Sequence, residues 1–155
     1  QSFATLRGTV IERDGVRLLE LLPGDDAIVA STTGDAPASP ANWRTMGVET
    51  LVGEITDPKC FLGAMKPGRG ITHRSCAALC ISGGIPPLFV VERVDGVFRA
   101  IVLVNADGSP IEGEARERLL TFVGERGIEI TGEVWCAGSA PFEAMRIDVN
   151  ALARR

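Results

Sequence analysis

The chain has 155 residues, of which 45% are apolar, and its 16 basic and 20 acidic residues give a net charge of −4. That length and apolar content fit about one domain, which buries roughly two-thirds of the surface of its unfolded chain. No basic run is longer than a pair and no apolar stretch reaches about eighteen residues, so the sequence indicates no nucleic-acid partner, no anionic membrane surface and no transmembrane segment.

The composition also indicates the kind of core and of secondary structure. Aromatic residues make up only 5% of the chain and tyrosine is absent, so we expect a core of aliphatic side chains. The 18 glycines and 9 prolines interrupt the chain often, which favours many short strands over long helices.

The N-terminal part predicts three short strands. Residues 5–12 and 16–22 are rich in aliphatic and β-branched side chains, and they flank Arg13-Asp14-Gly15, a sequence typical of a hairpin turn. Residues 26–31 predict the third strand. We expect these strands to form an extra sheet or a fragment of a second barrel.

A linker is expected next. Residues 32–41 are small and polar and include two prolines, which is typical of a linker. We therefore expect an N-terminal β segment and linker over residues 1–41 and an OB-like domain over residues 42–155. The chain begins at Gln1 rather than at methionine, which suggests that its N-terminus was processed or truncated.

The segment after the linker predicts a small barrel. A helix between the third and fourth of five strands is the order of an OB fold. We therefore expect a mainly-β (β-rich α+β) fold: a small OB-like, partly open barrel with one or two short helices, the alternative being a generic β-rich α+β domain. Gly8, Gly53 and Gly132 stand at equivalent places in three strand patterns, where glycine often marks a sharp bend. The strands are expected over residues 49–56, 87–94, 97–105, 128–136 and 142–150, and the helices over residues 73–82 and 114–127.

Reactive side chains gather in one short window of this domain. Cys60, His73, Cys76 and Cys80 are three of the four cysteines and the only histidine. With Thr72 as N-cap, the last three fall on one helix face, within an arc of roughly 60°. Cys60 is expected at the end of the preceding strand, and the glycine-rich loop between them can fold the helix back over it. The spacing C-x12-H-x2-C-x3-C matches no standard zinc finger.

Several chemistries are compatible with this cluster. Three cysteines and a histidine are a recognised ligand set for Zn or Cu(I), and with less precedent for an iron–sulfur cluster. A disulfide would join Cys60 to Cys76 or Cys80, because an i, i+4 pair on a helix is poorly aimed. Cys76, in the first helical turn, is also a candidate reactive thiol. The remaining alternative is that buried cysteines simply fill the helix face.

Two further residues are candidate ligands. Met65 lies in the loop and would be a soft axial ligand, although a single loop methionine is more often a packing residue. Cys136 follows Trp135 near the end of a predicted strand and would add a fourth thiol, although we favour an ordinary core cysteine at this position.

At these residues the chain resembles a group of largely uncharacterised bacterial proteins that are exported or tethered to the membrane. Their motif runs D-x-K-C-[FY], then a glycine-rich loop, then H-x-x-C-A-x-x-C and G-I-P. The resemblance spans roughly residues 53–91 and implies that the four clustered residues act together, outside the cytoplasm. The matching positions here are Asp57, Lys59, Cys60, Phe61, His73, Cys76, Ala77, Cys80, Gly84, Ile85 and Pro86.

Together these observations predict an exported, periplasmic or membrane-tethered accessory module without catalytic activity. Its cluster would bind a metal (Zn, Cu or an iron–sulfur cluster) or serve redox and electron-transfer chemistry. The module would be part of an envelope complex and would have other protein subunits as its partners. The alternatives are a disulfide-stabilised binding or structural module, and a thiol oxidoreductase that uses Cys76 or Cys80.

Overall fold

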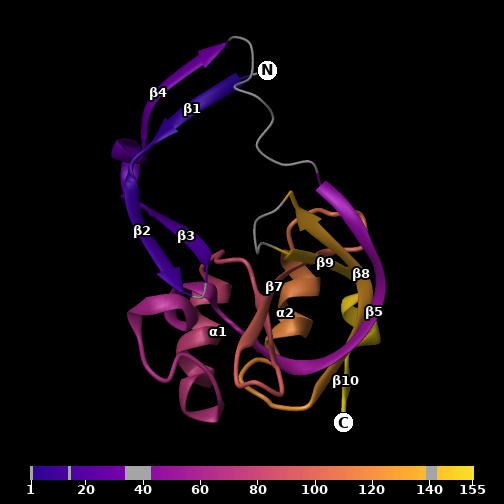
Figure 1. Cartoon of the computed structure of the whole chain (residues 1–155). Coiled ribbons are helices and arrows are strands. Elements are labelled where there is room, and N and C mark those ends of the chain that lie inside the picture. The colour runs from indigo at the N-terminus through magenta and orange to yellow at the C-terminus, as the bar shows by residue number, and fades with distance from the viewer. Residues whose placement is uncertain (1, 14, 34–42, 139–142) are drawn as a thin grey trace.

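The computed structural model describes residues 2–13, 15–33, 43–138 and 143–155, and they are mainly β (Figure 1). The predicted β-rich fold is therefore confirmed. Within these residues no helix is long and apolar enough to cross a membrane. The elements are β1 (Ser2–Leu6), β2 (Gly8–Arg13), β3 (Val16–Leu21), β4 (Ile28–Thr33), β5 (Trp43–Thr56), α1 (Arg74–Ser82), β6 (Leu88–Glu92), β7 (Phe98–Asn105), α2 (Gly113–Leu120), β8 (Ile128–Ala137), β9 (Glu143–Ile147) and β10 (Ala153–Arg154).

Five of these strands form a closed ring of hydrogen bonds. The order is β5-β6-β7-β9-β8, and β8 pairs again with β5. All neighbours are antiparallel except β7 and β9, which are parallel, and β10 extends the sheet beside β8. Because α2 follows the third strand of the ring, the predicted OB-like order is confirmed.

Glycines allow two strands to bend and to change partners. The first part of β5 pairs with β8 up to Gly53, and the last three residues pair with β6. A Cβ atom at Gly53 would collide with the backbone oxygen of Val90, and one at Gly132 would collide with that of Arg146. The close approach of neighbouring backbones therefore requires glycine at both positions, where the sequence predicted a bend.

The two helices close one end of the barrel. β5 and β7 both run antiparallel to β6, so α1, which follows β5, and α2, which follows β7, lie at the same end. Ala77 and Ile81 of α1 and Leu119 of α2 are buried with the barrel core. The helix predicted over residues 114–127 stops at Leu120, and the chain then turns through Gly124, whose φ of 73° lies outside the helical region.

The N-terminal strands form two separate pairs. β2 and β3 make the predicted hairpin, while β1 pairs with β4, so the strand predicted over residues 5–12 is in fact divided between β1 and β2. Figure 1 shows β1 and β4 standing away from the barrel and the β2–β3 hairpin reaching toward the segment near α1. Ile11, Val16 and Leu18 of the hairpin pack against the buried cluster to which Phe61 and Leu62 of that segment belong.

Most of the predicted linker lies outside the described residues, since residues 34–42 are not among them. Its first two positions, Thr32 and Thr33, belong to β4. The division into residues 1–41 and 42–155 stays a prediction.

Candidate metal centre

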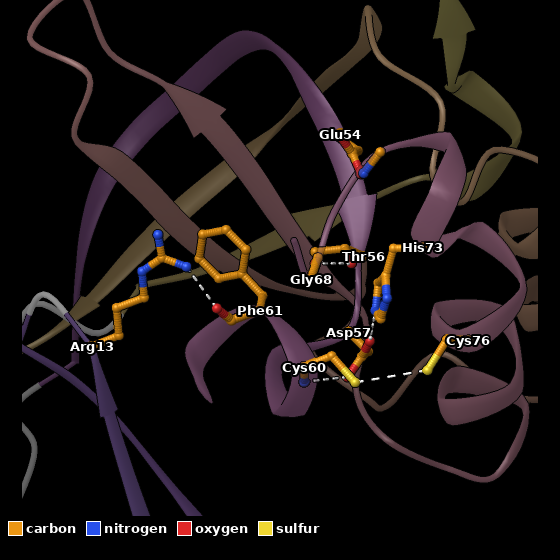
Figure 2. Close-up of polar contacts among 10 residues, drawn as sticks. Arg13, Glu54, Thr56, Asp57, Cys60, Phe61, Gly68, His73 and Cys76 are labelled. Atoms are coloured by element: carbon orange, nitrogen blue, oxygen red, sulfur yellow. Dashed lines mark hydrogen bonds and ion pairs between the residues drawn. The ribbon is translucent and has the colours of Figure 1, made fainter. Parts of the chain in front are cut away.

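Buried polar contacts fix the loop between β5 and α1. At its start, the Asp57 Oδ1 atom accepts a hydrogen bond of 2.8 Å from the backbone N–H of Cys60. Cys60 then opens a π-helical turn, Cys60–Ala64, and so does not end the strand as predicted. The Thr56 hydroxyl donates to the backbone oxygen of Gly68 (3.0 Å), and the buried Glu54 carboxylate accepts from the N–H of Gly70 (Figure 2). These bonds return the loop to β5 and bring α1 beside the π-helical turn.

His73 occupies the N-cap position of α1 but does not cap the helix with its side chain. Its Nε2 atom lies 2.9 Å from Asp57 Oδ2, and both side chains are buried (Figure 2). Thr72, the predicted N-cap, instead lies in a preceding 3-10 turn, Ile71–His73, so that prediction is wrong. The bond to Asp57 holds the imidazole against the end of β5.

The structure brings the predicted cysteines and histidine into one cluster. The Sγ atoms of Cys60 and Cys76 are 3.8 Å apart. One ligand atom from each of Cys60, His73 and Cys76 lies within 4.8 Å of the other two, and Asp57, Cys60 and Cys80 form a second set of the same kind. Cys60 belongs to both sets. The cluster is thus able to hold a metal ion, and no disulfide joins its three thiols, all of which are described.

Burial and a neighbouring carboxylate make two of the thiols, those of Cys60 and Cys80, resist ionisation. Burial, and then the charge of Asp57, raise the pKa of Cys60 to about 12, and the same two causes raise the pKa of Cys80. Lys59 directly precedes Cys60, but its ammonium pairs with Glu20. The hydrogen bond to Glu20 is the main cause that raises the pKa of Lys59. A bound cation would reverse the effect on the thiols, because its positive charge stabilises thiolates.

The two additional candidate ligands have different positions. Cys136 pairs in register with Arg44 at the start of β5, whereas Cys60 follows the far end of the same strand. Its Sγ atom lies 3.9 Å from the backbone oxygen of Gly138, and among the described residues it belongs to neither ligand set. Met65 follows the π-helical turn directly and is 49% exposed, and its role as an axial ligand stays a prediction.

Asp57 is the residue that ligand reasoning from the sequence missed. It entered only through the resemblance, although its three-residue spacing from Cys60 is that of a carboxylate that caps a turn. Its two oxygens contact the Cys60 backbone and the His73 ring, so it can either orient the histidine or serve as a ligand itself.

Comparison with models of known protein families, with curated proteins and with solved structures finds no match for this chain. The resemblance to exported bacterial proteins therefore stays a prediction. A function for the chain has to be inferred from the geometry and chemistry of the cluster itself.

Proposed function

We propose that this chain is an accessory module that binds one Zn²⁺ ion. Cys60, His73 and Cys76 are three of the ligands, and Cys80 is the fourth, with Asp57 as the group that orients His73. The observation that carries the proposal is the mutual approach of the first three ligand atoms to within 4.8 Å in a buried part of the chain.

The distances favour a single ion. With zinc–sulfur bonds of about 2.3 Å, two thiolates on a tetrahedral ion stand about 3.8 Å apart. The Cys60 and Cys76 sulfur atoms are separated by 3.8 Å. In a [4Fe–4S] cluster each cysteine binds a different iron, so its ligating sulfurs stand further apart than these do.

The charge of the surroundings favours Zn²⁺ over Cu(I). Both ions accept thiolate and imidazole ligands. Asp57, however, is completely buried and adds a negative charge beside the thiols of Cys60 and Cys80. A divalent ion offsets more of that charge than a monovalent ion does, since an uncompensated buried charge is costly.

A titration of the reduced full chain with Zn²⁺ against a competing chelator tests the proposal. We expect one ion per chain, and a loss of affinity of at least about tenfold in the variants Cys76→Ser and His73→Asn. Cys136→Ser is the matched control, since this thiol lies in neither ligand set, and it should bind Zn²⁺ as the parent does. Reduced parent protein that does not retain Zn²⁺, or an equal loss in all three variants, would contradict the proposal.

The proposal also includes export and a role beside the protein subunits of an envelope complex, and both rest on the resemblance of residues 53–91 to exported bacterial proteins. Cell fractionation of a native bacterial host tests the location. Recovery of the tagged protein in the cytoplasmic fraction would contradict export and would leave the metal site to be judged by the titration.

A further inference from the structure

Two thiols of the cluster are in contact but differ in their access to solvent. Cys60 is only 4% exposed, while Cys76, at the N-terminal turn of α1, is partly exposed. Their sulfur atoms are 3.8 Å apart, and a disulfide bond of about 2.05 Å needs an approach of roughly 2 Å. Rotation of the Cys76 side chain can supply much of that movement without unwinding the helix.

We propose that Cys60 and Cys76 form a dithiol pair, which a small disulfide such as glutathione disulfide oxidises with release of the metal. The release step rests on the proposed zinc site. The oxidation step rests only on the contact between the two sulfur atoms. The cluster would then act as a redox-controlled metal site rather than as a permanent structural one.

The reaction takes place in two balanced exchanges. The more accessible Cys76 thiolate attacks one sulfur of glutathione disulfide, forms a mixed disulfide and releases one glutathione thiolate. The Cys60 thiolate then attacks the Cys76 sulfur and releases the second glutathione thiolate. Two protein thiolates are oxidised to one disulfide, one glutathione disulfide is reduced to two thiolates, and Zn²⁺ leaves because two of its ligands are lost.

The order of the two exchanges follows from burial. A bulky disulfide reaches the partly exposed Cys76 before it reaches Cys60, which the π-helical turn and α1 enclose. Since a metal-bound thiolate is already deprotonated, the first exchange needs no separate base. Reduced glutathione in excess would reverse both steps and restore the metal ligands.

The experiment treats the zinc-loaded, reduced full chain with glutathione disulfide and follows zinc release, free thiols and disulfide-linked peptides. We expect the loss of two thiols for each Zn²⁺ released. Because Cys76 and Cys80 lie on the same tryptic peptide, residues 75–93, the mapping is repeated in Cys80→Ser, in which a link to the Cys60 peptide identifies Cys76 as the partner.

The variant Cys60→Ser provides the second readout. It should stop at the mixed disulfide, with one glutathione retained on Cys76. Persistence of all thiols in the parent, or a link between the peptides that disappears in Cys80→Ser, would overturn the dithiol proposal. Peptide mapping of protein kept free of metal keeps the two proposals separate. A Cys60–Cys76 link there supports the dithiol pair whether or not the reduced chain binds Zn²⁺, and failure of the reduced chain to bind Zn²⁺ contradicts only the zinc site.

Discussion

At the scale of single residues, Asp57 explains how one short segment can hold several reactive groups in place. One oxygen of its carboxylate accepts the N–H of Cys60, and the other bonds to the ring of His73. Both bonds are buried, where the loss of one partner leaves a polar group unsatisfied. The same charge raises the pKa of Cys60 and Cys80, after the larger effect of burial, so the cluster is prepared for a cation.

Replacement of Cys60 should therefore destabilise the zinc-loaded protein. A cross-link that ties the π-helical turn to α1 is worth about 3 kcal/mol, and about 1 kcal/mol corresponds to roughly 2–4 °C for a chain of this size. We expect Cys60→Ser to lower the melting temperature by several degrees in the presence of Zn²⁺. Most of that difference should disappear when chelator and reductant are added.

Cys136→Ser is the control for these thermal melts. Cys136 lies on β8 near the barrel end opposite Cys60, so its replacement should shift the melting temperature much less, and equally with and without Zn²⁺. Equal small shifts in the two variants would mean that the clustering of the thiols has no energetic consequence.

At the scale of elements, the β2–β3 hairpin supports the turn that carries Cys60. The Arg13 guanidinium donates to the backbone oxygen of Phe61 (2.8 Å) and lies 4.8 Å from the centre of its ring. A Cβ atom at Gly63 would come 2.5 Å from the Ile11 side chain, so the hairpin packs closely on this turn. The position of Cys60 thus depends partly on strands far away in sequence.

This contact predicts that a change in the hairpin weakens metal binding. Hydrogen bonds that involve a charged group contribute about 1.5–3 kcal/mol, and about 1.4 kcal/mol is a factor of ten in affinity. If part of this energy is coupled to the site, Arg13→Ala should lower the affinity for Zn²⁺ by about three- to tenfold in the chelator competition.

Arg17→Ala is the matched control, because Arg17 lies on the same hairpin and pairs with Glu12 at the surface. It should leave the affinity unchanged. An affinity of Arg13→Ala equal to that of the parent would show that the hairpin and the metal site are independent.

At the scale of the whole molecule, the two ends of the barrel are closed in different ways. α1 and α2 cover one end with apolar side chains. Arg99 lies two residues before the buried Ile101 on the same strand, so both side chains point to the same, inner face of the barrel. Near the other end of the barrel its guanidinium donates to Glu49 (2.6 Å) and to Glu143 (2.5 Å). The ion triad joins β5, β7 and β9 across the barrel.

This triad should make stability depend on pH in a defined direction. The hydrogen bond from Arg99 is the main cause that lowers the pKa of Glu49. A carboxyl whose pKa is lower in the folded state stabilises the fold above its unfolded pKa of about 4.3, and this contribution is lost as the pH falls through the folded pKa. We expect the free energy of unfolding of the parent to exceed that of Glu49→Gln by about 1 kcal/mol at pH 7. This difference should shrink as the pH falls below about 4.3 toward pH 3.

Denaturant unfolding of the parent and of Glu49→Gln across this pH range measures the effect. Glu117→Gln, an exposed position on α2, is the control and should follow the parent at every pH. A difference between the parent and Glu49→Gln that stays constant from pH 7 to pH 3 would mean that the ionisation of Glu49 does not stabilise the barrel.

The sequence by itself determined those features that depend on local pattern. Alternating apolar residues and turn signals predicted the hairpins on either side of Gly15 and Gly96, and the order of strands and helix predicted the OB-like barrel. Helical spacing placed His73, Cys76 and Cys80 on one segment near Cys60. Strand and helix periodicity are properties of neighbouring residues, so they can be read without a tertiary structure.

Only the tertiary structure decided how distant groups meet. The parallel pairing of β7 with β9, the division of the first strand and the π-helical turn at Cys60 depend on contacts between remote segments. The same is true of the buried contact between His73 and Asp57, which lies sixteen residues earlier. Pairing across such distances follows from packing and burial, since local periodicity specifies which face a residue occupies but not which residue lies opposite.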